Sequence, residues 1–422
     1  MSDFLSICRE RGFLHQCTDE SGLADKLQPN LVCYTGYDCT GPSLHVGHLL
    51  PTMLLRWWQK CGHKPLVLMG GATTKIGDPS GKDASRQLLD DATIAANMAS
   101  IRNGFRNLLE FEDSFDPTSN KAFMVNNHDW FQHIGLYEYL RDIGSHFTVN
   151  RMMAMESVKL RLDRESPLSL LEFNYMVFQS YDFYHLSQEY ACQVQFGGSD
   201  QWGNITMGVD LARRLAASRQ QPAQELYGAT VPLLMTASGA KMGKTADGAV
   251  WLNADMLSPY AYWQYWRNCD DADVIRFLKL FTELPLEQIA EYETWQGSAQ
   301  INDAKIILAT EATALLHGHE AAEAAKETAR QTFVEGASGA DLPETTIATG
   351  ILQAGIPAYQ LFQQAGLAAS GKEARRLIQG GGAKVNDAKI DDENQLIGVS
   401  DLTNGEIKLS AGKKKHVLVK AA

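Results

Sequence analysis

Three kinds of feature are missing from this chain of 422 residues. No run of apolar residues reaches the roughly 18 that a transmembrane helix needs, and the first residues lack the charged-then-apolar layout of a signal peptide. The seven cysteines are scattered, and no two have the C-x-x-C spacing of a zinc or redox site. We therefore expect a cytoplasmic protein with reduced thiols, no membrane partner and no tightly bound metal.

Positive charge is also scarce. The chain has 38 Lys and Arg against 50 Asp and Glu, so its formal net charge is −12. This balance argues against a protein that coats nucleic acid over its whole surface, although a local basic patch can still bind RNA. The contents of 45% hydrophobic and 21% charged residues are typical of globular domains, and the length suggests two or three of them.

Short apolar segments alternate with longer helical patterns between residues 30 and 235. The segments predicted as buried strands are 31–36, 65–71, 122–125, 192–196 and 230–235, and the predicted helices are 44–61, 85–109, 169–187 and 201–217. This alternation is typical of an α/β fold with a Rossmann-like, doubly wound parallel sheet, in which ligands bind at the carboxyl ends of strands. We assign residues 1–250 to this domain.

Strand patterns stop after the α/β region. Residues 251–333 have apolar side chains at helical spacing and are predicted to form an α-helical domain. Residues 334–350 are rich in Gly, Ala and Ser, which indicates a linker. Residues 351–422 predict a small α+β domain. From Ser370 onward it has ten basic and seven acidic residues, which favours an RNA-binding face.

The clearest local motif follows the first predicted strand. His45-Val-Gly47-His48 opens a helix, and the spacing of three puts both imidazoles on one face. At that helix end, backbone N–H groups and the positive end of the helix dipole favour phosphate, and Gly47 leaves room for a ligand. The alternative for this motif alone is a pair of helix-capping histidines.

Positive charge gathers beside two other strand ends. Residues 70–82 form a glycine-rich turn with Lys75 and Lys82, and Arg86 follows it, although the spacing is not that of a P-loop. Residues 238–245 have lysines on both sides of a glycine, which suits the charge that develops on a pyrophosphate leaving group. The alternatives are an ordinary turn and a solvated lysine loop.

Two polar patterns favour a binding pocket. Tyr175, Gln179 and Asp182 recur at spacings of four and three, so they line one helix face among apolar neighbours. Gly198 and Asp200 follow a strand, where the glycine can admit a sugar and the carboxylate can bind ribose hydroxyls. An exposed helix face and a simple turn are the alternatives.

Together these motifs resemble the class I aminoacyl-tRNA synthetases. His45-Val-Gly-His48 is similar to their H-I-G-H element, and Lys241-Met-Gly-Lys244-Thr245 is similar to their K-M-S-K-S element. Within the class, essentially the whole chain resembles the bacterial-type tyrosyl-tRNA synthetases. The further motifs that carry this resemblance are Tyr34-x-Gly-x-Asp-x-Thr40, Gly-Asp78-Pro-Ser-Gly-Lys82, Asn126-Asn-x-Asp-Trp130, Tyr175-x-x-x-Gln179-x-x-Asp182 and Gly-Gly-Ser-Asp200-Gln-Trp-Gly-Asn.

The resemblance implies that ATP, accompanied by Mg²⁺, activates L-tyrosine, which then passes to the terminal ribose of a cognate tRNA. It implies a homodimer formed through an insertion at 130–164. It assigns catalysis at the phosphates to Thr40, His45, His48, Lys82, Arg86, Lys241, Lys244 and Thr245. It assigns tyrosine binding to Tyr34, Asp78, Asn127, Tyr175, Gln179, Asp182 and Gln201. It assigns ATP binding to Gly36, Asp38, Gly47, Gly198, Asp200 and Lys244.

The last domain resembles the RNA-binding module that a small-subunit ribosomal protein shares with pseudouridine synthases. By that resemblance the residues facing RNA are Lys372, Arg375, Arg376 and Lys384. Three other functions stay open at this point. They are a tryptophanyl-type synthetase, a non-catalytic RNA-binding or regulatory relative, and a nucleotidyltransferase of the same fold that acts on a small metabolite.

Overall fold

The computed structural model describes residues 3–80, 89–237, 239, 242–245, 248–334, 342–403, 405–412 and 415–421, with the backbone alone at 244–245 and 332–334. None of the helices within these ranges combines the length and the apolar character that a membrane span requires. The chain divides into two compact units, Met1–Leu257 with Trp266–Leu316 and Ser258–Tyr265 with His317–Ala422.

A six-stranded sheet forms the centre of the first unit. Its order is β1–β6–β5–β2–β3–β4, and every neighbouring pair is parallel except β1 with β6. The strands are β1 (Gln16–Cys17), β2 (Val32–Tyr37), β3 (Lys64–Met69), β4 (Phe123–Asn126), β5 (Cys192–Gly198) and β6 (Tyr227–Val231). The chain runs outward from β2 to β4 and then returns to the other side of β2 with β5. The sheet therefore switches direction between β2 and β5, where such folds bind ligands.

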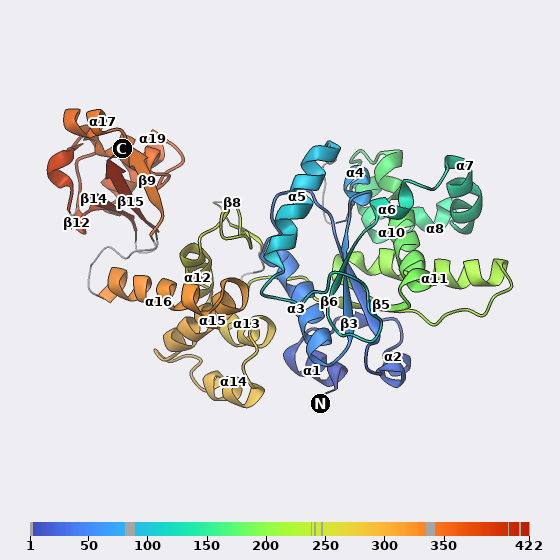
Figure 1. The fold of residues 1–422 in the computed structure, drawn as a ribbon. Helices are drawn as coiled ribbons and strands as arrows, with labels where there is room; N and C mark the ends of the chain where they lie inside the picture. Colours follow the sequence, from blue (N-terminus) through green and yellow to red (C-terminus); the bar gives the residue numbers. More distant parts are fainter. Residues whose placement is uncertain are drawn as a thin grey trace. The chain divides into compact units, whose positions relative to one another are not determined.

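Helices cover both faces of this sheet. α3 (Val46–Lys60) and α5 (Asp91–Gly104) lie on one side, and α10 (Leu170–Glu189) and α11 (Trp202–Ser218) lie on the other (Figure 1). In α3, Leu50, Leu54 and Trp58 recur at every fourth position and are buried, as an amphipathic helix requires. α10 begins with a capping box, because the Ser169 hydroxyl accepts from the Glu172 backbone N–H and the Glu172 carboxylate accepts from that of Ser169.

Two predictions for the sheet were wrong in detail. The strand predicted at 230–235 is β6 at Tyr227–Val231, and it ends there because Pro232 has no N–H for the ladder. The sheet is also not fully parallel, since the two-residue strand β1 pairs antiparallel with β6. β1 is too short to show a period, and it lies between the unpredicted helices α1 (Phe4–Arg11) and α2 (Glu20–Lys26).

Short elements fill the long connections of this unit. After β3 comes α4 (Thr73–Ile76), and after β4 the insertion folds as short helices, while β7 and β8 form a small antiparallel pair beyond β6. The helices of the insertion are α6 (His128–Phe131), α7 (Leu136–Glu138), the π-helix Tyr139–Ile143, the 3₁₀-helix Gly144–His146, α8 (Val149–Met153) and α9 (Glu156–Asp163). A 3₁₀-helix at Ser199–Gln201 precedes α11, and the small pair is β7 (Lys244–Thr245) and β8 (Gly248–Ala249).

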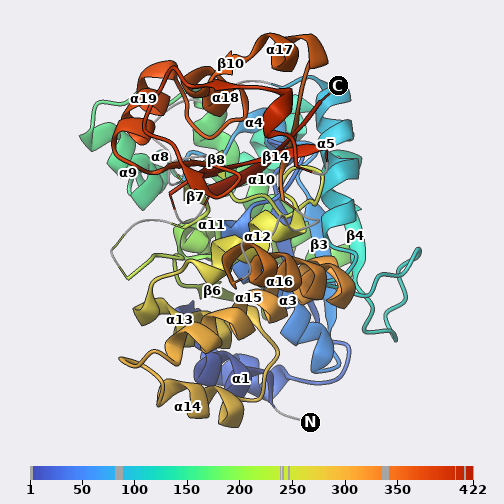
Figure 2. The ribbon, with the colours of Figure 1, turned by 90° about the vertical axis from the view of Figure 1, so that its left-hand side faces the viewer.

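The region predicted as a separate helical domain is shared between the two units. Its helices are α12 (Pro259–Arg267), α13 (Val274–Phe281), α14 (Leu286–Glu293), α15 (Ile301–His317) and α16 (His319–Val334), with a 3₁₀-helix at Asp271–Asp273. Figure 2 shows α13 beside α1, and α14 packs against α13. The Arg11 guanidinium on α1 donates to the carbonyl oxygens of Lys279, Thr282 and Leu284 at 2.7–3.0 Å. These bonds satisfy the end of α13, so this helix belongs with the sheet.

The C-terminal module has a five-stranded sheet of order β12–β11–β14–β15–β9. The strands of this sheet are β9 (Glu344–Ile347), β11 (Ala383–Val385), β12 (Ala388–Lys389), β14 (Glu406–Ala411) and β15 (Lys415–Ala421), and β10 (Ile356–Pro357) and β13 (Leu396–Ile397) form a separate antiparallel pair. Its helices are α17 (Thr349–Ala354), α18 (Ala358–Gln364), α19 (Gly371–Gln379) and the 3₁₀-helix Val399–Asp401.

The predicted linker 334–350 overlaps this module. β9 falls inside that range and pairs in parallel with β15, about seventy residues later, from Glu344 opposite Leu418 to Ile347 opposite Ala421. A four-residue strand whose partner is the last strand of the chain has no local signature, which explains the error. Residues 335–341 of the predicted linker lie outside the described residues.

Candidate active site

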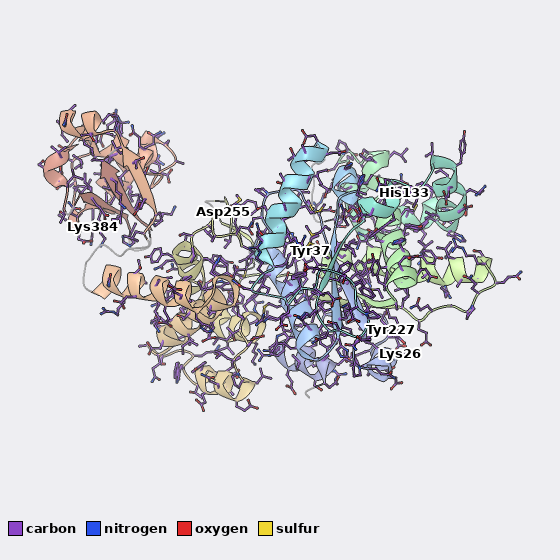
Figure 3. The ribbon with its side chains drawn as sticks, in the orientation of Figure 1. Lys26, Tyr37, His133, Tyr227, Asp255 and Lys384 are labelled. Atoms are coloured by element: carbon purple, nitrogen blue, oxygen red, sulfur yellow. The ribbon has the colours of Figure 1, made fainter. Side chains whose placement is uncertain are left out.

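A cleft of about 550 Å³ opens where β2 and β5 end, with the start of α3 and one face of α10 among its walls. Its volume is in the range of small-molecule sites. Tyr37, labelled in Figure 3, ends β2, and its hydroxyl lies 2.9 Å from that of Thr52 on α3. The sequence-predicted residues that line the cleft are Tyr34, Gly36, Asp38, Thr40, His45, Gly47, His48, Asp78, Tyr175, Gln179, Asp182, Gly198, Asp200 and Gln201.

Other predicted residues are placed elsewhere or are not described. Asn127 is fully buried behind the wall of the cleft and is not among its lining residues. Lys82, Arg86 and Lys241 lie outside the described residues, and so do the side chains of Lys244 and Thr245. The predicted RNA contacts Lys372, Arg375, Arg376 and Lys384 belong to the C-terminal module.

One end of the cleft is built around two buried groups. The Asp182 side chain on α10 accepts hydrogen bonds from Asn127 Nδ2 at 3.1 Å and from Trp130 Nε1 at 2.9 Å. The Tyr34 hydroxyl on β2 is buried and has no hydrogen-bond partner among the described residues. Since buried polar groups are nearly always paired, these two side chains are suited to a ligand hydroxyl, which can donate and accept at once.

Electrostatics support this interpretation. Burial raises the pKa of Asp182 well above its usual range, and the charge of Asp38 raises it further, while the bonds from Asn127 and Trp130 act in the opposite direction. Burial also raises the pKa of Tyr34, with the charge of Asp182 as the next cause. Tyr34 therefore keeps its proton, and the Asp182 carboxyl gains from any further hydrogen-bond donor.

A second carboxylate lies further along the cleft. Asp78 accepts from Gln201 Nε2 at 2.8 Å and from the Ser80 backbone N–H at 2.9 Å, and burial raises its pKa. Asn204 donates to the Oε1 atoms of both Gln201 and Gln179, so the amide of Gln201 has a fixed orientation. The partners of Asp78 are neutral donors, which leaves it suited to a cationic ligand group.

The start of α3 presents the two histidines of the His45-x-x-His48 motif. The Gly47 backbone N–H donates to His45 Nδ1 at 3.0 Å, and the His45 backbone N–H donates to His48 Nδ1 at 3.2 Å. Because each Nδ1 accepts, each neutral ring has its proton on Nε2, and both rings are donors at a helix N-terminus. A Cβ at position 47 would lie 2.8 Å from His45 Cε1, so any residue other than glycine would have to displace the His45 ring.

Two residues that hold the site together were not predicted as part of it. Trp130 was read as the start of the insertion, and Thr73 as part of a glycine-rich turn. Thr73 Oγ1 donates to Asp38 Oδ1 at 2.8 Å, and Tyr175 Oη donates to Asp38 Oδ2 at 3.2 Å. Asp182 is buried and Asp38 is partly buried, and the need of such carboxylates for donors is the signal that could have directed attention to both residues.

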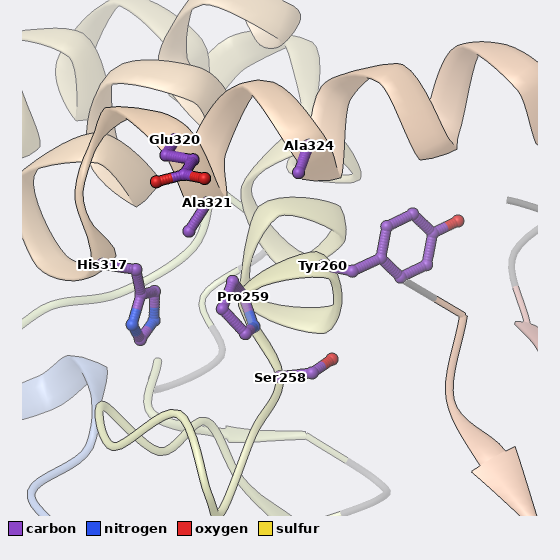
Figure 4. Close-up of a pocket in the computed structure, with 7 residues that line it drawn as sticks. All are labelled: Ser258, Pro259, Tyr260, His317, Glu320, Ala321 and Ala324. Carbon is purple, nitrogen blue, oxygen red and sulfur yellow. The ribbon is translucent and has the colours of Figure 1, made fainter. Parts of the chain in front are cut away.

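A separate cavity of about 380 Å³ lies in the second unit (Figure 4). Its walls come from the start of α12, the end of α15 and α16, and no sequence-predicted site residue lines it. His317 Nε2 is buried there without a hydrogen-bond partner among the described residues, and burial lowers the pKa of His317 to about 4. The predicted chemistry therefore belongs to the cleft of the first unit.

The predicted RNA residues of the C-terminal module divide into two kinds. Lys372, Arg376 and Lys384 are exposed, and Figure 3 labels Lys384. Arg375 is half-buried, stacks over the Tyr359 ring at 3.8 Å and lies 3.3 Å from the Glu393 carboxylate. Three of the four predicted cations therefore reach solvent, and the fourth is held against the surface of the module.

Known proteins resemble this chain over its full length. Residues 26–334 match the family described as tRNA synthetases class I (W and Y). The chain is 55% identical over 420 residues to the tyrosine–tRNA ligase of Methylocella silvestris, which covers 99% of this chain and 98% of that protein. It is 54% identical over 424 residues to that of Rhodopseudomonas palustris, with coverage of 100% and 99%. The truncated mitochondrial tyrosyl-tRNA synthetase of Aspergillus nidulans has a TM-score of 0.69 at 31% identity and covers 79% of this chain and 95% of its own.

Replacing Asp182 with Asn tests how the buried carboxylate affects stability. Because burial raises its pKa in the folded state above the ordinary value of about 3.9, the folded protein holds the proton more tightly than the unfolded chain does. The proton on Asp182 therefore stabilises the folded state relative to the ionised form. This stabilisation is fully present below about pH 4 and is lost as the pH rises towards the folded pKa. The thermal midpoint of the wild type should therefore fall relative to that of Asp182→Asn between about pH 4 and pH 7.

The control is Asp255→Asn, which removes an exposed carboxylate and should follow the wild-type profile. Thermal midpoints measured by circular dichroism across this pH range decide the question. Parallel curves for the wild type and Asp182→Asn would contradict the assigned burial.

Proposed function

The chain belongs to the class I tRNA synthetases of the tryptophan and tyrosine group, and we propose that its cleft is the active site of a tyrosine–tRNA ligase. The enzyme joins L-tyrosine to ATP, giving tyrosyl-adenylate and pyrophosphate, and then transfers tyrosine to the 3′-terminal ribose of its tRNA. The observation that carries this proposal is the buried pair of Tyr34 and Asp182, which suits a phenol.

The phenol of the substrate donates to Asp182 and accepts from Tyr34. Phenylalanine cannot make either bond, so its binding would leave the buried Tyr34 hydroxyl without a partner and would deprive buried Asp182 of the donor that tyrosine supplies, which is unfavourable. This is how the cleft selects tyrosine. The proposed role of Asn127 is to hold Asp182, which is supported by its hydrogen bond to that side chain and by its complete burial.

The rest of the amino acid lies along the cleft towards Asp78. The carboxylate of Asp78, with the side chains of Tyr175 and Gln179, binds the ammonium group, whose positive charge offsets the cost of burying Asp78. Gln201, fixed between Asp78 and Asn204, then lies near the substrate carboxylate. Gly36, Asp38, Gly198 and Asp200 receive the nucleoside, with the two carboxylates accepting from ribose hydroxyls.

Activation needs no nucleophile from the protein. The carboxylate oxygen of tyrosine attacks the α-phosphorus, the new O–P bond forms, and the bond to the β-phosphate oxygen breaks so that pyrophosphate leaves with the electron pair. The Nε2–H groups of His45 and His48, at the N-terminus of α3, stabilise the charge that develops there. By family resemblance, the further groups at the phosphates are Thr40, Lys82, Arg86, Lys241, Lys244 and Thr245. ATP arrives with Mg²⁺, which offsets phosphate charge.

ATP–pyrophosphate exchange without tRNA tests this activity. Each of the twenty amino acids is supplied in turn, with Mg²⁺ present, so that adenylate formation is measured apart from RNA recognition. We expect exchange with tyrosine alone. Exchange with tryptophan would show that the roles of Tyr34 and Asp182 are misassigned, and no exchange with any amino acid would favour a non-catalytic RNA-binding relative.

We also propose that the C-terminal module binds tRNA through its exposed cations. Lys372, Arg376 and Lys384 reach solvent there and can contact phosphates.

The Arg376→Glu variant should therefore lower kcat/KM for tRNA about tenfold, since one charge-assisted contact is lost and one repulsion is gained, and should leave tyrosine-dependent exchange unchanged. Lys121→Glu makes the same charge change at an exposed position of the first unit and is the control. Equal losses of aminoacylation in both variants would contradict a docking role.

A homodimer and a cytoplasmic site of action complete the proposal, since charged tRNA is consumed at ribosomes. Large apolar side chains are exposed on and beside the insertion, with Leu136 70%, Tyr137 86% and Leu170 77% exposed. Such a surface is typical of a protein–protein interface.

In sedimentation at micromolar concentration we expect the wild type to be a dimer and Tyr137→Asp to be a monomer. Leu396→Asp, at an apolar residue 62% exposed in the C-terminal module, should stay dimeric. A monomeric wild type would rule the interface out.

A further inference from the structure

Both polar atoms of the Asn127 amide form hydrogen bonds with other groups of the protein. Its Oδ1 accepts from the Ala72 backbone N–H at 2.7 Å, so the two hydrogens of Nδ2 face the opposite way. One is donated to Thr73 Oγ1 at 3.0 Å and the other to Asp182 Oδ2 at 3.1 Å. Asn127 is 0% exposed, so these bonds are made away from water. The same amide group therefore holds Asp182 and Thr73.

Thr73 extends this network to the other end of the cleft. A carboxylate can only accept, so the Thr73 hydroxyl donates its hydrogen to Asp38 at 2.8 Å and accepts from Asn127. The approach is tight, because a Cβ at Gly70 would lie 2.4 Å from Asp38 Oδ1 and 2.5 Å from Thr73 Oγ1. Thr73 is 2% exposed. The direction of every bond from Asn127 to Asp38 is thus determined by the chemistry of the groups.

The network joins two ends of the site that bind different substrates. Asp182 lies at the phenol end, and Asp38 lies where the nucleoside is proposed to bind. Hydrogen bonds in a chain away from water polarise one another, so a ligand donor that arrives at Asp38 changes the acceptor strength of Thr73 and hence the bond that Asn127 gives to Asp182. Groups in one such network give non-additive energies.

We propose that Asn127 and Thr73 are positioning residues that make the binding of tyrosine and the binding of ATP interdependent. The proposal rests on the proposed function, because that function places tyrosine at Asp182 and the nucleoside at Asp38. It differs from the direct tyrosine-binding role that the resemblance assigns to Asn127. By thermodynamic linkage the effect is reciprocal, so either ligand can report it.

The experiment measures the dissociation constant of tyrosine by calorimetry with the full-length protein, without and with saturating Mg²⁺ and α,β-methylene-ATP. This analogue has a P–C bond in place of the bond that would break, so no adenylate forms. The ratio of the two constants is the linkage factor. In the wild type we expect this factor to differ from one by about threefold or more. The Thr73→Val variant keeps the shape of the side chain and removes the hydroxyl. Its linkage factor should be close to one, because the network is interrupted.

Three variants separate the network from a general loss of structure. Thr73→Ser restores the hydroxyl and should restore the linkage factor, and Thr73→Ala replaces the valine variant if that variant does not fold. Trp130→Phe removes the other donor to Asp182 and leaves the network between Asn127 and Asp38 in place. This control should weaken tyrosine binding and keep the wild-type linkage factor.

The outcomes are distinguishable from a failure of the proposed function. A wild type that supports tyrosine-dependent exchange but has a linkage factor of one overturns the inference alone, and so does a wild-type factor in Thr73→Val. A wild type that does not bind tyrosine overturns both the function and the inference. The inference would also be overturned if the linkage factor of Trp130→Phe moved towards one as far as that of Thr73→Val. Any disturbance of Asp182 would then be enough to remove the linkage.

Discussion

The buried carboxyl of Asp182 is the constraint on which the cleft depends. A buried carboxylate is costly unless donors satisfy it, and the described donors to Asp182 are the neutral side chains of Asn127 and Trp130. Burial therefore raises the pKa of Asp182, and a substrate hydroxyl that donates to it is favoured. In the proposed function this carboxyl selects a phenol, because each of its oxygens has one described donor and can accept a further hydrogen bond from the substrate.

The groups at this end of the cleft come from separate parts of the chain. Asp182 is on α10, Asn127 directly follows β4, and Tyr34 is on β2. The carboxyl ends of β2 and β4 lie at the same end of the parallel strands, and α10 contributes Tyr175, Gln179 and Asp182 to the cleft. The backbone N–H of Asn127 donates to the Met69 carbonyl at the end of β3, which fixes the amide next to Thr73. Helix, sheet and site are therefore one packed assembly.

Much of this arrangement was predictable from the sequence, and the exceptions have physical causes. The strand–helix alternation and the spacing of Tyr175, Gln179 and Asp182 predicted the cleft and one of its walls, because both patterns are local. The roles of Trp130 and Thr73 were missed because a hydrogen bond across 52 or 35 positions leaves no spacing to detect. The antiparallel edge β1 and the strand β9 were missed for the same reason, since each depends on a distant partner.

The most direct test of the central claim compares kcat/KM for tyrosine and for phenylalanine in the wild type and in Asp182→Ala. If the buried carboxyl selects the phenol, the ratio of the two values should fall by about 100-fold in the variant, because phenylalanine then no longer leaves a buried acceptor without the donor that tyrosine supplies. An unchanged ratio would mean that the cleft selects its substrate by other groups and that Asp182 has a structural role only.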